Sequence, residues 1–466
     1  DKHAARLAGV HPLHLDGARN LLHYLSLRAN DIGDLQRYLS TLGLSALRFA
    51  ESDAMGNVKA ILHWLDKGEV PEQRVNYEAA QKRLKQMSMR HFGQSSTLPL
   101  PMVTLSYKRF EQNANYISTL LRSGMRIARI NCGHERIEEW EAMARAVKKH
   151  SAELGIPCTI HFDLSGPKLR IRNIFERSEK SKKSALLSNG QFVIMAEEAP
   201  EKSSWGPAHW WFTAALPDLI THLEKGQIIH FDDGIAKGQV VEKSEGRVLL
   251  EVTFTELEKV KIKVDAGINI PELASQFPAL TEDDRLHLLA VKAHANIYGL
   301  SFVNRIEDIS DLRELLEREA PDAGLMIKLE TPQAFVHLPE ILFELMAYPS
   351  ISVMIARGDL GLSMGFDRLS EVQEEVLWLC EAAHIPVVWA TQVLEKMVKK
   401  GLPSRPEITD AAMSVRAEAV MLNKGDHQDV ALEFLLEILT RMHGHYEKKR
   451  LLMRPLGLAT RFLEKA

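Results

Sequence analysis

From about residue 98 onward, the hydrophobic pattern consists of short apolar runs separated by amphipathic segments of helix length. Eight such runs occur, at residues 102–105, 125–130, 158–162, 297–302, 325–329, 351–355, 387–390 and 419–422. They are apolar on both faces, as buried parallel strands are. Gly124 and Gly155 stand where helices between the runs are expected to end. The pattern predicts repeated strand–helix units.

Residues 15–90 show the apolar spacing of helices instead. One apolar face recurs at helical spacing and comprises Ile32, Leu35, Tyr38, Leu39 and Leu42. Gly43 is expected to end that helix. Leucine-rich stripes of this kind usually form a packed core, and no chemical motif accompanies them. We therefore predict a helical N-terminal domain over residues 1–97.

The strand–helix rhythm breaks between about Arg172 and Lys263. This stretch alternates apolar and polar residues and contains turn signals such as Asp232-Asp233-Gly234. We interpret residues 172–263 as a small all-β domain of antiparallel strands. Its removal leaves about 240 residues for eight units, close to the roughly 250 of a (β/α)₈ barrel. The predicted fold class is α/β: a TIM barrel over 98–171 and 264–466, with the β domain inserted after strand 3.

Composition excludes several classes of protein. The 466 residues exceed what one core usually holds, so two or three domains are expected. The net charge is −4 and no basic stripe interleaves with aromatic residues, so we expect no nucleic-acid partner. No apolar stretch reaches the roughly 20 residues of a membrane span. Three separated cysteines, Cys132, Cys158 and Cys380, favour a reducing compartment, and we expect a cytoplasmic location.

Polar residues follow nearly every predicted strand at its carboxyl end, which is where such barrels carry their chemistry. Lys328 and Glu330 are two residues apart and point to the same side, and Asp359 follows the next apolar run. Glu330 and Asp359 are hard oxygen donors suited to Mg²⁺ or Mn²⁺. Lys328 supplies a fixed positive charge that suits a transferred phosphoryl group or an enolate. These residues predict a cation site facing an ammonium group.

Further strand ends add anion-binding and proton-relay groups. Arg129 and Arg170 can clamp phosphate, and Gly358 allows backbone N–H groups to approach an anion. Thr391 offers a hydroxyl that can hold water or relay a proton. Each has an ordinary explanation when taken alone: a Lys-x-Glu pair is usually a surface ion pair, Asp163 could cap the turn that follows it, and Thr391 could cap its strand. Their occurrence together at successive strand ends indicates a functional site.

In this order, the motifs resemble the pyruvate kinase family over about residues 101–433. The most specific are Gly124-Met-Arg-Ile-Ala-Arg129-Ile-Asn131, Asp163-Leu-Ser-Gly-Pro-Lys168-Leu-Arg170, Phe231-Asp-Asp-Gly234, Ile327-Lys328-Leu-Glu330, Met354-Ile-Ala-Arg-Gly-Asp359-Leu-Gly361 and Ala390-Thr391-Gln392-Val-Leu-Glu395. The interrupted barrel is also similar to that family, in which a small β domain closes over the site.

The resemblance implies a reaction and a role for each residue. Phosphate would pass from phosphoenolpyruvate to ADP, giving pyruvate and ATP. Lys328 would stand beside the phosphoryl group and the enolate, Glu330 and Asp359 would hold Mg²⁺, and Thr391 would lie where the enolate is protonated. The remaining implied contacts are Arg129 and Arg170 for phosphate, Asn131 and His134 for the nucleotide and monovalent-ion region, and the backbone of Ala356, Arg357 and Gly358 for the substrate carboxylate.

The sequence departs from the family at the potassium site. The family uses Asn, Ser, Asp and Thr there, whereas this chain has Asn131, Gly133, Asp163 and Leu164, so two oxygen ligands are missing. Lys168 resembles the branch of the family in which a lysine ammonium replaces the ion. We therefore expect activity that does not require K⁺.

Other departures concern the nucleotide and the termini. Asp265-Ala266 replaces a lysine pair of the family, and Asn423-Lys424-Gly425-Asp426 replaces its Ser-Gly-Glu-Thr. The family's carboxyl-terminal effector domain has no counterpart in this sequence, so we expect a homodimer without sugar-phosphate activation. Two alternatives to an active pyruvate kinase stay open. One is a non-catalytic regulator, and the other is a different barrel enzyme acting on phosphoenolpyruvate or a pyruvate enolate.

Overall fold

The computed structural model describes residues 4–44, 47, 50–66, 77–94, 99–167, 169–177, 180–200, 205–214, 219–232, 234–270, 277–443, 446–447 and 450–451. Its centre is a closed barrel of eight parallel strands in the order β1-β18-β17-β16-β15-β14-β3-β2. The strands are β1 (Leu100–Thr104), β2 (Ile127–Asn131), β3 (Thr159–Asp163), β14 (Ile297–Leu300), β15 (Gly324–Leu329), β16 (Ile351–Ala356), β17 (Val387–Ala390) and β18 (Ala419–Leu422). Each predicted apolar run forms one of them, which confirms the predicted fold class.

Helices alternate with these strands and cover the barrel. They are α6 (Tyr107–Gln112), α7 (Tyr116–Arg122), α8 (Ile137–Leu154), α10 (Glu282–Val291), α11 (Ile306–Glu319), α12 (Pro332–Val336), α13 (Leu338–Leu345), α14 (Arg357–Met364), α15 (Leu369–Ala382), α16 (Glu395–Lys400), α17 (Arg405–Met413) and α18 (Gln428–His443). Gly155 ends α8 in the left-handed conformation, with φ of 64°, as its position predicts. Among the described residues, no helix is long and apolar enough to cross a membrane.

The segment between β3 and α10 forms a separate β domain. Its elements are β4 (Leu169–Glu176), β5 (Ser181–Lys182), β6 (Ser184–Leu187), β7 (Phe192–Ala196), β8 (Trp210–Ala214), α9 (Leu219–His222), β9 (Ile228–Phe231), β10 (Ala236–Ser244), β11 (Arg247–Thr255), β12 (Val260–Lys263) and β13 (Gly267–Asn269). The main sheet runs β13-β9-β10-β11-β7-β8-β4-β5, and β13 also pairs with β4. The predicted hairpin is present, since β9 pairs antiparallel with β10 around Asp232 and Gly234. Asp233 lies outside the described residues.

One strand pair corrects the expectation of an antiparallel domain. β7 and β8 run parallel, with Val193 opposite Trp210. Thirteen residues, 197–209, separate β7 from β8 in the sequence, and a connection of that length allows a parallel return. The sheet also begins at Leu169 and ends at Asn269, beyond the range 172–263 that the alternation pattern marks.

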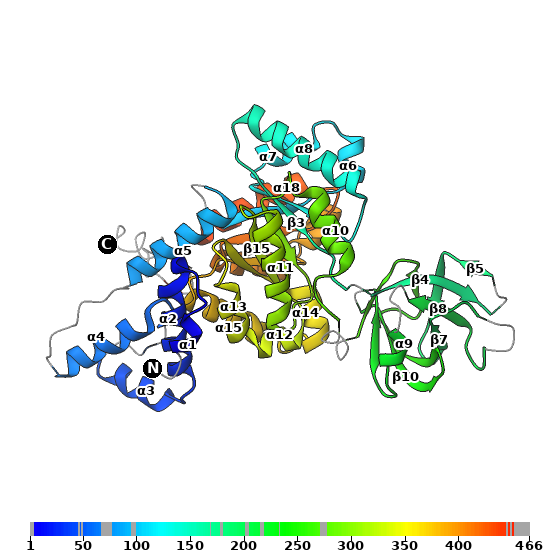
Figure 1. The fold of residues 1–466 in the computed structure, drawn as a ribbon, viewed down its shortest axis with the longest axis horizontal. Helices are drawn as coiled ribbons and strands as arrows, with labels where there is room; N and C mark the ends of the chain where they lie inside the picture. The colour runs from blue at the N-terminus through cyan, green and yellow to red at the C-terminus, as the bar shows by residue number, and fades with distance from the viewer. Residues whose placement is uncertain are drawn as a thin grey trace, which may run out of the picture.

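The N-terminal region consists of helices, as predicted: α1 (Ala4–Leu7), η1 (Pro12–His14), α2 (Leu15–Arg28), α3 (Gly33–Thr41), η2 (Glu51–Asp53), α4 (Ala54–Asp66) and α5 (Tyr77–Phe92). Figure 1 shows these helices on one side of the barrel and the inserted β domain on the other. Helix α2 packs closely on the barrel, because a Cβ added to Gly17 would lie 2.2 Å from the carbonyl oxygen of Ala383. The Asn20 amide also donates to the Ala382 carbonyl at 2.9 Å. The N-terminal helices are therefore docked on the barrel through specific contacts.

Candidate active site at the carboxyl ends of the barrel strands

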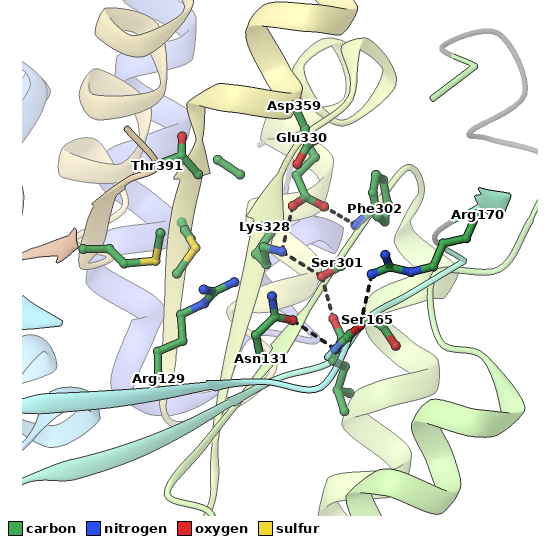
Figure 2. A pocket seen from close by; sticks show the side chains of 15 residues that line it. Arg129, Asn131, Ser165, Arg170, Ser301, Phe302, Lys328, Glu330, Asp359 and Thr391 are labelled. Carbon is green, nitrogen blue, oxygen red and sulfur yellow. Dashed lines mark hydrogen bonds and ion pairs between the residues drawn. The ribbon is translucent and has the colours of Figure 1, made fainter. Parts of the chain in front are cut away.

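The predicted charged residues converge on one cavity at the carboxyl ends of the strands (Figure 2). Parallel strands bring their carboxyl ends to the same mouth of a barrel, and inward-facing side chains alternate along each strand. Ten of the residues that line the cavity are Arg129, Asn131, Arg170, Ser301, Phe302, Lys328, Glu330, Ala356, Asp359 and Thr391. Barrel closure therefore gathers side chains that are far apart in the sequence.

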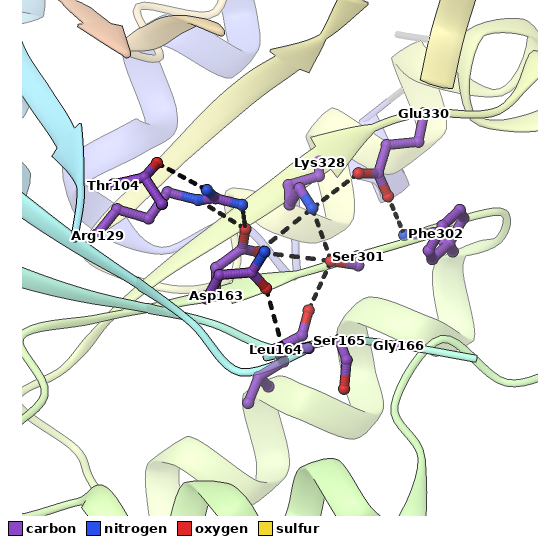
Figure 3. Close-up of polar contacts among 12 residues, drawn as sticks. Thr104, Arg129, Asp163, Leu164, Ser165, Gly166, Ser301, Phe302, Lys328 and Glu330 are labelled. Atoms are coloured by element: carbon purple, nitrogen blue, oxygen red, sulfur yellow. Dashed lines mark hydrogen bonds and ion pairs between the residues drawn. The ribbon is translucent and has the colours of Figure 1, made fainter. Parts of the chain in front are cut away.

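Asp163 lies at the centre of a buried charge network (Figure 3). It accepts hydrogen bonds from Nε of Arg129 at 2.8 Å and from Nη2 of the same guanidinium. Lys328 Nζ is 3.4 Å from its other carboxylate oxygen. Burial alone would raise the pKa of Asp163, but Arg129 and Lys328 hold it well below its ordinary value. Asp163 is therefore a buried anion between two cations, and it does not serve as a turn cap.

Lys328 forms a buried ion pair with Glu330, so this Lys-x-Glu pair is not a surface feature. Lys328 Nζ is 2.7 Å from Glu330 Oε1 and donates to the Ser301 hydroxyl at 2.8 Å. Burial opposes the charged form of Lys328, but Asp163 and Glu330 outweigh it and raise its pKa above 10.5. The lysine is thus a fixed ammonium at the base of the cavity.

Glu330 and Asp359 provide two carboxylates to the same cavity. Glu330 Oε2 accepts the backbone N–H of Phe302 at 2.7 Å. Burial raises the pKa of Glu330; Lys328 opposes this change, and the nearby charge of Asp359 adds to it. Two carboxylates whose charges disfavour each other are a donor set that a hard divalent cation would stabilise. Within the described residues, no three His, Cys, Asp or Glu side chains gather as a metal-binding group, so such a cation would need further oxygen ligands from substrate and water.

Thr391 is held in an unusual backbone conformation beside helix α14. Its φ is +64°, which is rare for a β-branched residue and costs free energy. Its hydroxyl accepts the Gly358 N–H at 2.7 Å, and its carbonyl accepts from Nη2 of Arg357 at 2.6 Å. The same guanidinium is bound by both carboxylate oxygens of Asp410. The Arg357 side chain therefore fixes the Thr391 loop. Ala356 and Asp359 line the cavity, whereas Arg357 and Gly358 between them are not among its lining residues.

Other predicted residues are placed less centrally. Asn131 and Arg170 both line the cavity; Asn131 Oδ1 accepts the Gly133 N–H at 3.0 Å, and Nη2 of Arg170 donates to the Gly133 carbonyl at 3.0 Å. His134 is exposed and is not among the cavity-lining residues. Lys168 lies outside the described residues.

Two residues with structural roles at the site were not assigned from the sequence. Ser301 accepts from Lys328 and donates to the Leu164 carbonyl at 2.6 Å, which ties β14 to the loop after β3. The sequence signal that could identify Ser301 is its position at the carboxyl end of the predicted strand at residues 297–302. Asp284 accepts the backbone N–H groups of Ser165 at 3.0 Å and of Gly166 at 3.1 Å. The contact between Asp284 and this loop joins segments more than a hundred residues apart, and no local sequence pattern predicts it.

The fold and the site define a (β/α)₈ barrel protein with a buried lysine and a pair of carboxylates at the carboxyl ends of its strands. Residues 103–428 match the family described as pyruvate kinase, barrel domain. This match covers more than half of the chain, and the chain belongs to the pyruvate kinase family.

Individual relatives are similar over the same part of the chain. A pyruvate kinase of Methylorubrum extorquens is 33% identical over 331 residues, which are 70% of this chain and 64% of that protein. A pyruvate kinase of Staphylococcus haemolyticus is 28% identical over 355 residues, or 73% of this chain and 56% of that protein. The chain thus spans less than two thirds of the length of these relatives. The crystal structure of a pyruvate kinase from Cryptosporidium parvum superposes with a TM-score of 0.64 at 21% identity, covering 78% of this chain and 71% of that one, and so shares its fold.

Proposed function

We propose that this protein is a phosphotransferase of the pyruvate kinase type, which transfers the phosphoryl group of phosphoenolpyruvate to ADP and releases pyruvate and ATP. The observation that carries the proposal is the buried Lys328 ammonium, 2.7 Å from Glu330 and open to the cavity that Asp359 and Thr391 also line. A fixed cation at a water-poor site stabilises negative charge on a phosphoryl group and on an enolate.

Glu330 and Asp359 are the residues that would hold Mg²⁺ or Mn²⁺. Both are oxygen donors, and both line the same cavity. When bound, the cation would neutralise negative charge on substrate oxygens during phosphoryl transfer. The raised pKa of Glu330, caused by burial with Lys328 opposing and Asp359 adding to it, supports this assignment because a bound cation would relieve the repulsion.

The other side chains bind and orient the substrates. Arg129 and Arg170 would contact phosphate oxygens, and the backbone at the start of α14 would receive the substrate carboxylate. During transfer the bond between phosphorus and the enol oxygen breaks, and a bond from phosphorus to a terminal oxygen of ADP forms. Lys328 stabilises the enolate that remains. Thr391, whose hydroxyl accepts from Gly358 N, would relay a proton from a water molecule: its O–H hydrogen passes to the enolate carbon and the water reprotonates the hydroxyl, which yields pyruvate and hydroxide, neutralised by solvent.

We also propose that turnover does not require K⁺. Gly133 and Leu164 stand where the family has two oxygen ligands, and Lys168 is the residue whose ammonium would replace the ion. Replacing KCl with tetramethylammonium chloride at constant ionic strength should leave the rate of pyruvate formation within about twofold. A rise of tenfold or more with added K⁺ would contradict this part of the proposal.

A coupled assay of pyruvate formation tests the proposed activity and separates it from the alternatives. Pyruvate should form only when phosphoenolpyruvate, ADP and Mg²⁺ are all present. Pyruvate formed without ADP would indicate a different barrel enzyme, and no pyruvate under any condition would favour a non-catalytic regulator.

The variant Lys328→Met tests the site assignment itself. It should lower kcat at least about a hundredfold, since it removes a positioned charge from the reacting group. Lys149→Met is the matched control, because Lys149 lies on α8 with its side chain 70% exposed. Full activity in Lys328→Met would show that the site is wrongly assigned.

A further inference from the structure

The N-terminal helix α5 contributes to the interior of the barrel. Phe92, at the end of α5, is 2% exposed and belongs to the apolar cluster inside the barrel. All other members of that cluster lie on barrel strands, and they include Met354 and Met421, which also line the candidate active site. One apolar cluster inside the barrel therefore connects Phe92 of α5 to Met354 and Met421, which line the cavity.

His91, the residue before Phe92, is hydrogen-bonded at the start of β16, the strand next to the one that carries Lys328. Its ring nitrogens lie 3.0 Å from the Ser350 hydroxyl and 2.7 Å from the Ser352 hydroxyl. A neutral imidazole has one donor and one acceptor, which matches two serine hydroxyls. The ring also lies against Gly324, where an added Cβ would come within 2.7 Å of two ring atoms.

Gly324 and Lys328 lie on the same face of β15. Side chains alternate along a strand, so Gly324, Met326 and Lys328 all point into the barrel. Met326 is also the register partner of Ser352 on β16. His91 therefore contacts Gly324, the first residue of β15, directly. It reaches Met326, in the middle of β15, through Ser352. Lys328 lies on the same face of β15, near its carboxyl end.

His161 occupies the next level of the barrel interior, below the charge network. It is fully buried, and it faces inward on β3 two residues before Asp163. Its Nε2 would be 2.5 Å from a Cβ added to Gly299, and an oxygen of Asp163 lies 3.1 Å from the same point. Because Gly299 has no side chain, the His161 ring can occupy the space next to Asp163.

We propose that His91 is a positioning residue for the Lys328–Asp163 ion pair, and that the N-terminal helices therefore contribute to catalysis. The proposal rests on the proposed function. His91 fixes the amino-terminal end of β15 and its register with β16. His161 fills the space beside Asp163 by packing alone, since neither of its ring nitrogens has a hydrogen-bond partner among the described residues. Displacement of a charged group by about 1 Å can cost up to a hundredfold in rate, so the floor of the barrel controls turnover without touching substrate.

His91→Leu in the full chain tests this inference, because leucine has a side chain of similar size but cannot form either hydrogen bond. We expect kcat for pyruvate formation to fall about tenfold while KM for phosphoenolpyruvate stays within about twofold. Amide hydrogen exchange in residues 325–329 should accelerate at least about tenfold. His91→Gln, which can donate to one serine and accept from the other, should restore kcat to within about threefold of the parent. His23→Gln, at an exposed position on α2, is the control.

Unchanged kcat together with unchanged exchange in a folded His91→Leu variant would overturn the inference. An equal fall in kcat for His91→Leu and His91→Gln would overturn it as well, because the hydrogen bonds would then be irrelevant. If His91→Leu does not fold, Ser352→Ala decides: its kcat should fall, and an unchanged value refutes the inference. If the parent protein forms no pyruvate, the proposed function fails, whereas the exchange measurement still shows whether α5 fixes β15.

Discussion

Acidification should weaken the attachment of the N-terminal helices to the barrel, because three buried histidines lie at this junction. His14 at the end of η1 and His91 at the end of α5 face the loop and strand around β16. His384, just after α15, lies 3.1 Å from the Ser52 carbonyl of the N-terminal region. Burial lowers the pKa of His14 and of His384 to about 4, and burial lowers that of His91 to about 3. At neutral pH all three are uncharged in the folded protein.

The sign of the effect follows from the difference between the folded and unfolded pKa values. In the unfolded chain these histidines bind protons below their ordinary pKa of 6.5, whereas the folded protein keeps them neutral until about pH 4 or lower. The folded state therefore loses stability as pH falls from 6.5 toward 4. Between pH 7 and pH 5 each histidine costs about 2 kcal/mol, or about 6 kcal/mol together. Domains are usually stable by roughly 5–15 kcal/mol, so this loss is large.

Denaturant unfolding at pH 7.5, 6.5, 5.5 and 5.0, followed by circular dichroism, measures this effect. The N-terminal helices and the outer layer of the barrel share one hydrophobic core, so they should unfold together, with a midpoint that falls steeply below pH 6.5. His384→Gln should reduce the pH-dependent loss by about a third, whereas His337→Gln, at an exposed position between α12 and α13, should leave it unchanged. A midpoint that is the same at pH 5.0 and pH 7.5 would refute the reasoning.

Three further outcomes are expected. Asp410→Asn weakens the hold on Arg357 and thus on the Thr391 carbonyl, so kcat for pyruvate formation should fall about tenfold at an almost unchanged Tm; full activity would show that this contact is dispensable. Glu135→Gln removes the anionic partner of Lys424, and we expect the released ammonium to attract a nucleotide phosphate. KM for ADP should then fall about threefold without a change in KM for phosphoenolpyruvate, and a raised KM for ADP would contradict this. Chelation of divalent cations should abolish pyruvate formation and Mn²⁺ should restore it, whereas activity that survives chelation would exclude the cation role of Glu330.

The barrel could be predicted from the sequence because its signal is local. A parallel strand buried on both faces is a continuous apolar run, and each of the eight runs forms a barrel strand. The inserted domain was predicted less well. The alternation over residues 172–263 predicts an antiparallel β domain, but β4 and β13 lie partly or wholly beyond that range, and β8 pairs parallel with β7. Pairing in such a sheet depends on distant partners, and local alternation does not specify them.

The site shows the same division between local and distant information. Lys328 lies near the carboxyl end of β15, Glu330 directly follows this strand, and Asp359 follows β16. Their convergence therefore follows from strand direction alone. The support around them depends on distant contacts: Asp284 holds the loop after β3 and Asp410 holds Arg357. Asp284 forms a local capping box with Thr281 at the start of α10, but that motif does not reveal its contact with the loop after β3. Asp410 acquires its partner Arg357 only in the folded chain.

The fold class, the eight strands and the charged residues at their ends can be predicted from the sequence, because apolar periodicity and strand direction are encoded within a few residues. The charge state of the site residues and the contacts that hold them in place become visible only in the folded chain. The tertiary structure showed that Lys328 is a buried ammonium between two carboxylates, since burial and charge separation depend on neighbours from other strands. It also placed His91 of the N-terminal helices inside the barrel, a contact between residues 261 positions apart that no local pattern can express.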